Sequence, residues 1–186
     1  MKKMSLRARV LTGAVAAAAL SAGTFGALSA NAAQPAAAPQ KPAATADVSG
    51  RDVHRTSHLT AAAATRAAQA VLKAAAEDNQ RVTVAVVDRN GNTITVVRGD
   101  GAGPQSYESA ERKAFTAVSW NAPTSELVER LENAPNLKDI PGTLFLGGGV
   151  PVAVDGAPVA GIGVAGAPSG ALDEKYAQAG VAALAR

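Results

Sequence analysis

Val82-Thr83-Val84-Ala85-Val86-Val87-Asp88 carries the strongest signal of fold class in the sequence. β-branched residues dominate it, which predicts a strand. Asn90-Gly91 follows, a dipeptide typical of a two-residue hairpin turn, so the range 92–98 is predicted to return as a second strand. Because the first strand is apolar almost throughout, we expect burial on both faces, with helices covering the sheet.

Helices are predicted on both sides of this hairpin in the sequence. Thr60 is a good N-cap for an alanine-rich helix over 61–76, and Leu59 is placed to staple it. A second helix is predicted over 109–121, because small residues recur there at helical spacing. These small residues are Ala110, Ala114, Ala117 and Val118.

The second half of the chain predicts a short helix over 125–131, a strand over 142–146, and a second hairpin. That hairpin joins strands 150–154 and 157–165, and a closing helix over 172–185 follows. Gly161, Gly163 and Gly166 are expected to pack against a helix or a neighbouring subunit. These elements predict one α/β domain in which helices cover a mainly antiparallel sheet of about five strands.

The N-terminal residues have the pattern of a secretory signal peptide. A basic start (Lys2, Lys3, Arg7 and Arg9) precedes an apolar region over 10–28, and Ala30-Asn31-Ala32 is a cleavage motif. We expect residues 1–32 to be removed and the protein to be secreted, extracellular or associated with the cell wall. The alternative is a membrane anchor, because the apolar region is long enough to span a bilayer. Residues 33–57 are predicted to be an Ala/Pro-rich flexible linker and arm.

Charge and cysteine content exclude several classes of function. The sequence has a formal net charge of +3, but the chain from residue 33 onward has 14 basic and 15 acidic residues. A nucleic-acid partner is therefore not expected, because phosphate binding needs a surplus of cations. There are no cysteines, which excludes disulfides, thiol chemistry and cysteine-bound metals.

The helix over 109–121 carries the main candidate site. Arg112, Lys113, Thr116 and Trp120 are spaced so that they share one strip of its surface. Two cations, a hydroxyl and the only tryptophan suit a flat, apolar ligand with anionic groups at its edge. The alternative is an ordinary amphipathic helix with a solvated basic edge.

Metal ligands are suggested at two other places. His54 and His58, the only histidines, are four residues apart, a spacing that would place them on one face of a helix. Glu77 and Asp78 lie at a helix C-terminus, where cations are favoured. The alternatives are surface histidines in a mobile arm and a solvated turn. No Ser/His/Asp set can be assembled from the sequence.

Four segments in order resemble the GlcG/HbpS family of haem-binding, haem-degrading proteins. They are Leu59-Thr60 with the alanine-rich helix, the range 82–91, the range 112–117 and the range 146–152. The resemblance covers residues 58–186. It implies an α/β/α sandwich with a five-stranded sheet, and assembly into a homo-oligomer, an octamer.

The resemblance also implies a function. The family's haem site uses a threonine that matches Thr116, here the expected ligand of the haem iron. Lys113 and Arg112 would then pair with the propionates, and Phe115 and Trp120 would pack on the porphyrin. The implied protein binds haem outside the cell and degrades it slowly. It also stores the iron and signals redox state to the extracytoplasmic part of a membrane sensor histidine kinase.

Two other functions remain open at this point. One is a true haem-degrading enzyme that turns over at the same site. The other is a binding module for a corrinoid or a small acid.

Overall fold

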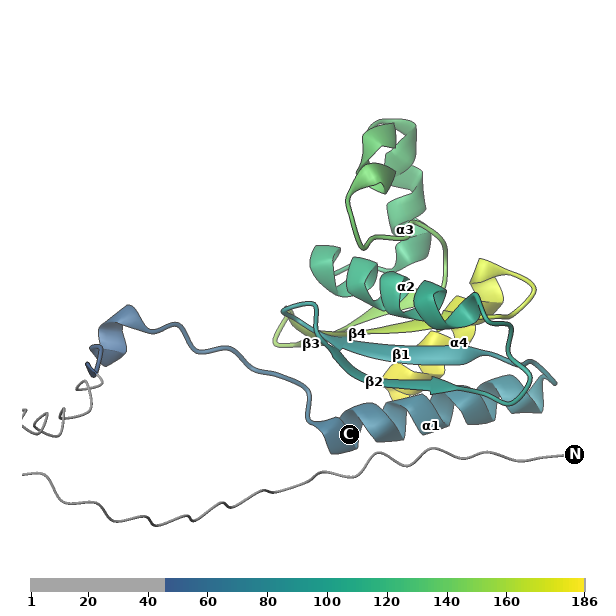
Figure 1. Ribbon diagram of the computed structural model, residues 1–186, viewed down its shortest axis with the longest axis horizontal. Helices are drawn as coiled ribbons and strands as arrows, with labels where there is room; N and C mark the ends of the chain where they lie inside the picture. Colours follow the sequence, from purple (N-terminus) through teal and green to yellow (C-terminus); the bar gives the residue numbers. More distant parts are fainter. Residues whose placement is uncertain (1–45, 186) are drawn as a thin grey trace, which may run out of the picture. The chain divides into compact units, whose positions relative to one another are not determined.

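The computed structural model describes residues 46–185. Figure 1 shows a sheet between helices, with α2 on one face and both α1 and α4 on the other. The helices are α1 (Ala61–Glu77), α2 (Ser106–Trp120), α3 (Thr124–Glu129) and α4 (Gly170–Ala182). The strands are β1 (Thr83–Asp88), β2 (Thr93–Arg98), β3 (Gly149–Val154) and β4 (Ala157–Ala165). Short 3-10 helices are η1 (Gly50–Asp52), η2 (Arg130–Glu132) and η3 (Pro135–Asp139).

The sheet is antiparallel throughout, in the order β2-β1-β4-β3. This confirms the predicted α/β/α class, but the sheet has four strands and not five. The range 142–146 does not form the predicted strand. Its Leu144 N–H donates to the hydroxyl of Thr116 at 2.8 Å, and its Leu146 N–H donates to the Leu144 carbonyl. Both groups are therefore unavailable to a β-ladder.

The first hairpin has a longer turn than predicted. Asp88 N–H donates to the Asn92 carbonyl at 2.8 Å, which leaves three residues in the loop where the sequence predicted two. Gly91 has a φ of +87°, the conformation that this loop type requires. The Asp88 carboxylate accepts from the backbone N–H groups of Asn90 and Asn92 and stabilises the turn. Burial raises the pKa of Asp88, but these hydrogen bonds outweigh it, so the pKa lies below its ordinary value.

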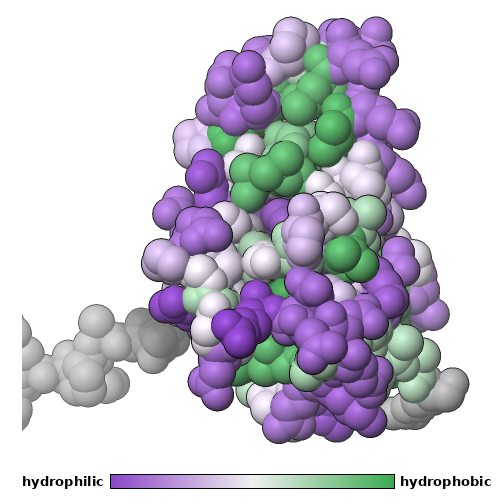
Figure 2. All heavy atoms as spheres, turned by 90° about the vertical axis from the view of Figure 1, so that its right-hand side faces the viewer, coloured by the Kyte–Doolittle hydropathy of each residue, from purple (hydrophilic) through white to green (hydrophobic). Residues whose placement is uncertain are grey.

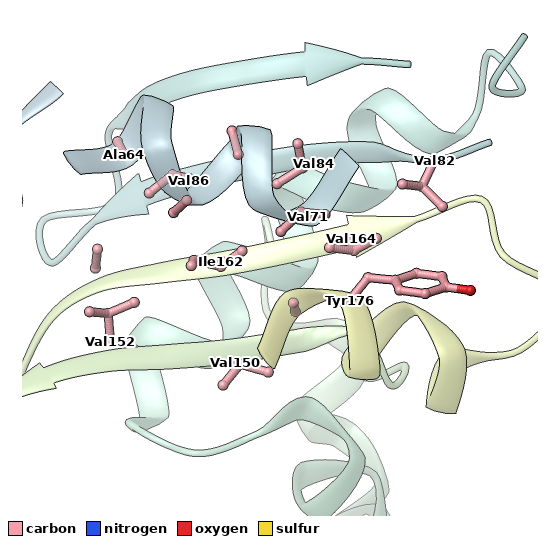
Figure 3. Packing of buried hydrophobic residues seen from close by; sticks show 14 of the residues in the cluster. Ala64, Val71, Val82, Val84, Val86, Val150, Val152, Ile162, Val164 and Tyr176 are labelled. Carbon is pink, nitrogen blue, oxygen red and sulfur yellow. The ribbon is translucent and has the colours of Figure 1, made fainter. Parts of the chain in front are cut away.

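The main hydrophobic core lies between the sheet and the pair α1 and α4 (Figure 3). Val84 and Val86 of β1 and Ile162 of β4 are fully buried there, facing Val71 of α1 and Tyr176 of α4. The predicted alanine-rich helix is confirmed, with its Thr60 hydroxyl accepting from Ala63 N–H. Its small side chains allow α1 to lie close to both the sheet and α4.

α2 lies against the other face of the sheet, directly over two glycines of β4. A Cβ on Gly163 would collide with the Ala110 carbonyl, and one on Gly161 would collide with the Ala114 carbonyl. The expectation that these glycines pack against a helix is thus confirmed, and the helix belongs to the same chain. Contact this close requires glycine.

The predicted signal peptide and residues 33–45 of the predicted linker fall outside the described residues. The arm over 46–60 is described, and apart from η1 it contains no helix. Among residues 46–185 no helix is both long and apolar enough to cross a membrane.

Candidate functional site

Thr116 lies inside the protein, beneath the loop over 142–149. Its side chain is fully buried. Its hydroxyl donates to the Arg112 carbonyl at 2.7 Å and accepts from Leu144 N–H at 2.8 Å. The predicted strip on α2 does exist, but this part of it is covered by the chain itself. The hydroxyl serves to fasten the loop to the helix.

Lys113 is buried as well, next to Thr116 on the same strip. Its ammonium donates to Asp173 Oδ2 at 2.8 Å and to the Val164 carbonyl at 3.0 Å. Only 6% of its side chain is exposed, so the alternative of a solvated basic edge does not hold at this position. Burial raises the pKa of the Asp173 carboxyl, and the hydrogen bond from Lys113 opposes that shift.

A polar network around the start of α4 was missed in the sequence. The Glu174 carboxylate accepts from the Ser125 hydroxyl at 2.7 Å and from the backbone N–H groups of Ser125 and Gly148. Beside it, the Thr124 hydroxyl accepts from Gly149 N–H at 2.8 Å. These contacts join α3, α4 and the glycine loop (Gly147-Gly148-Gly149), which are far apart in sequence. The only sequence signal is a pair of acids near the start of a helix, with Asp173 in its first turn, which is typical of many solvated helices.

Arg112 and Phe115 lie at the edge of the strip. Arg112 is partly exposed and lies 3.5 Å from the Glu108 carboxylate one turn earlier. Phe115 is partly buried, and its ring lies between Gly91 of the hairpin turn and Gly142. Arg112 therefore remains the cation of the strip that solvent reaches.

Trp120 packs at the base of a helical protrusion formed by α3, η2 and η3 (Figure 1). Its ring meets that of Phe145 edge to face, with centroids 5.3 Å apart. Leu127, Leu131 and Leu137 complete this small cluster. Hydrophobic side chains gather over the upper part of the molecule in Figure 2, and Val128 and Ile140 of the protrusion are among the exposed apolar residues.

The histidines lie in the extended arm and not on a helix, so they share no helix face. The His58 ring is 2.9 Å from the Thr56 hydroxyl and 3.8 Å from the Asp88 carboxylate. His54 is exposed at the arm. Its side chain lines a pocket of about 400 Å³ between the arm and the turn that joins β3 to β4.

The pocket at the arm combines four kinds of chemistry, of which the Asp155 carboxylate is the one that opposes an anionic ligand. His54 supplies an imidazole, Arg55 and Arg89 supply cations, and Val154 and Val159 supply apolar surface. Such a set can hold a flat apolar ligand that carries anionic groups. Neither arginine was singled out in the sequence, because nothing in the pattern places residue 89 beside the arm.

Glu77 and Asp78 lie at the C-terminus of α1, and Asp78 is its C-cap. No cluster of three or more ligating side chains is found among those residues. Asp78 accepts from Lys175 Nζ at 2.7 Å and from the Tyr176 hydroxyl at 2.9 Å, and Glu77 is exposed. The hydrogen bond from Lys175 lowers the pKa of Asp78. A lysine ammonium thus lies where the sequence suggested a metal ion.

Comparison with known proteins identifies the family. A model of the family described as "Haem degrading protein HbpS-like" matches residues 59–182. The chain belongs to the HbpS-like family. The resemblance read from the four sequence segments is thereby confirmed.

Solved structures of several similar proteins share the fold. A double mutant of HbpS from Streptomyces reticuli is 66% identical, covers 78% of this chain and 100% of its own, and has a TM-score of 0.77. A second HbpS structure is 68% identical, with coverages of 76% and 100% and a TM-score of 0.75. A complex of PduOC with heme is 26% identical, with coverages of 68% and 95% and a TM-score of 0.63.

A curated relative is an uncharacterized 15.0 kDa protein from the dhaT-dhaS intergenic region of Citrobacter freundii. It is 34% identical over an alignment of 113 residues, and the match covers 58% of this chain and 80% of the relative.

Proposed function

We propose that the protein is an exported haem-binding protein that degrades haem slowly, sequesters the iron and reports redox state to a membrane sensor histidine kinase. Membership in a family described as haem-degrading supports haem as the ligand. A structural neighbour solved with heme supports it independently. The observation on this chain that carries the proposal is the pocket at the arm, which brings an imidazole, two guanidinium groups and apolar side chains together.

The two candidate sites fit haem differently. At the strip on α2 the Thr116 hydroxyl is buried and bonded twice, and the Lys113 ammonium is held by Asp173. These groups do not fit a haem-ligand role unless the loop over 142–149 moves away. At the arm, His54 and His58 are exposed, and histidine is a common haem ligand.

At the arm, each side chain would have a separate task. The imidazole of His54, which lines the pocket, or that of His58, which lies on the arm outside the lining, would bind the iron. Arg55 and Arg89 would pair with the two propionates. Val154 and Val159 would take water away from the porphyrin face. Bound haem supplies the iron and oxygen chemistry, while the residues of this chain bind and orient it.

A hemin titration followed by absorbance tests the proposal. It uses the chain from Ala33 onward, Thr116→Ala and the double variant His54→Ala/His58→Ala. Thr65→Ala is a matched control for Thr116→Ala, because the Thr65 hydroxyl also donates to a carbonyl one turn earlier, at 2.9 Å, but on an exposed surface.

The result expected is a Soret shift that the double histidine variant loses and Thr116→Ala keeps. Loss in Thr116→Ala alone would place the ligand on α2, as the family resemblance implied, and would require the loop to open. No spectral shift in the unmodified chain would remove haem from the proposal altogether.

Three further parts of the proposal have separate tests. Haem loss with many turnovers per protein would make the protein a true enzyme, whereas a single turnover or less would make it primarily a binder. A monomer mass from light scattering would contradict the assembly into an octamer. Failure of the chain to alter autophosphorylation of a cognate sensor kinase, with and without peroxide, would remove the signalling role.

A further inference from the structure

A second pocket, of about 590 Å³, lies at the end of α1, beside the start of β1 and the end of β2. The arm pocket includes Arg89 of the β1–β2 turn, so the two cavities lie at opposite ends of this hairpin. The apolar lining of the pocket at the end of α1 comes from the last turns of that helix, from the start of β1 and from β2, namely Leu72, Ala75, Ala76, Val82 and Val97. Figure 2 views this end of the molecule, and its lower half shows hydrophobic surface surrounded by hydrophilic side chains. The pocket therefore offers apolar contact to a small ligand.

Two guanidinium groups line the same pocket. Arg98 donates from Nε and Nη2 to the Ala102 carbonyl, which leaves its Nη1 for another partner. Arg81 lies over Gly101, where a Cβ would be only 2.9 Å from the Arg81 Cδ. Within residues 46–185 no carboxylate lies within 4.0 Å of either guanidinium. Both cations can therefore receive an external anion.

Negative charge in the pocket is smaller than its positive charge. Asp100 is the acidic residue of the lining, against Arg81 and Arg98. The C-terminal end of α1 also adds little negative potential, because the Ala75 and Ala76 carbonyls accept backbone N–H groups from residues 78–80. The lining thus combines an apolar wall with one net positive charge.

From this lining we infer that the pocket at the end of α1 binds a small apolar carboxylic acid. The carboxylate pairs with Arg81 and with Nη1 of Arg98, and the hydrocarbon or aromatic body lies against Leu72, Val82 and Val97. The site is independent of haem and goes beyond the proposed function.

The test uses a pair of probes that differ in charge, 4-phenylbutyrate and 4-phenylbutan-1-ol. Each is titrated into the ¹⁵N-labelled chain from Ala33 onward, which contains the whole compact unit over 49–186, and amide shifts are followed without hemin. We expect shifts at residues 72–82 and 97–100, and binding of the acid about tenfold tighter than that of the alcohol. Residues 54–57 should not shift.

Two variants separate the charge from the fold. Arg81→Gln removes an exposed side chain and should weaken binding of the acid until its affinity equals that of the alcohol. Arg98→Lys loses the contact from Nη1 to the carboxylate but keeps a positive charge, so binding of the acid should weaken several-fold. Arg66→Gln removes one exposed charge elsewhere on α1 and should have no effect. Equal binding of acid and alcohol, shifts elsewhere, no binding at millimolar concentrations, or a dimer that covers the pocket would each overturn the inference.

Discussion

Replacing Lys113 by methionine should destabilise the protein strongly. Lys113 and Asp173 form an ion pair at 2.8 Å whose side chains are 6% and 5% exposed. Methionine fills a similar volume but leaves the Asp173 carboxylate buried beside an apolar side chain. Breaking one side of a buried pair costs about 3–5 kcal/mol of unfolding free energy, which lowers the midpoint of thermal unfolding by roughly 10 °C or more. Urea unfolding followed by tryptophan fluorescence and circular dichroism measures the loss.

The loss should depend on pH, because Asp173 then has no partner to oppose burial. Its pKa, already raised in the folded protein, should rise further in Lys113→Met. A carboxyl whose pKa is higher when folded stabilises the fold below its unfolded pKa of about 3.9, and that contribution is lost as pH rises through the folded pKa. The deficit of Lys113→Met should therefore be smaller at acidic pH than at pH values well above neutrality.

The double variant Lys113→Met/Asp173→Asn removes both charges of the pair. Asparagine is neutral and keeps an acceptor for Ala167 N–H, which donates to Asp173 Oδ1 at 3.0 Å. We expect it to recover more than half of the lost stability at neutral pH. A deficit of less than about 1 kcal/mol in Lys113→Met, or one that is the same at every pH, would refute the account of this pair as a buried ionic contact.

Two smaller perturbations test other contacts. Gly163→Ala should cost about 1–3 kcal/mol, because its Cβ would collide with the Ala110 carbonyl of α2, whereas Gly50→Ala has nothing within 4 Å and should be silent in the same urea unfolding assay. Asp78→Asn should make the free energy of unfolding depend less on pH in the acidic range. The hydrogen bond from Lys175 lowers the pKa of Asp78, so this contribution is present above an unfolded pKa of about 3.9 and is lost as pH falls. An unchanged profile would mean that the contact is not maintained in solution.

Local patterns predicted most of the secondary structure, because they depend on neighbours in the chain. β-branched residues identified β1, the Thr60 cap identified the start of α1, and Ser169 caps α4 near its predicted start. The strand predicted over 142–146 was wrong because the conformation of this range depends on the distant Thr116 hydroxyl. That hydroxyl accepts a backbone N–H that a strand would have needed for its ladder.

The candidate site was predicted only in part, for the same reason. Helical spacing correctly grouped Arg112, Lys113, Thr116 and Trp120 on one strip. It gave no information on what covers the strip, because Asp173 and the glycine loop come from elsewhere in the sequence. The pocket at the arm likewise depends on a contact between residues 54–57 and the β3–β4 turn, which no periodicity reveals.

The strand order has a consequence for the timing of folding. β4 (Ala157–Ala165) pairs with both β1 and β3, so the centre of the sheet is supplied by a segment close to the C-terminus. During synthesis the first hairpin and α1 emerge long before that segment, and an isolated two-stranded hairpin is marginally stable in water. The domain therefore cannot close until nearly the whole chain is available, and its long-range pairing favours slow folding. Until β4 has emerged, a nascent chain of this design lacks the centre of its sheet, and an incomplete sheet of this kind is easier to thread through a narrow channel than a closed domain.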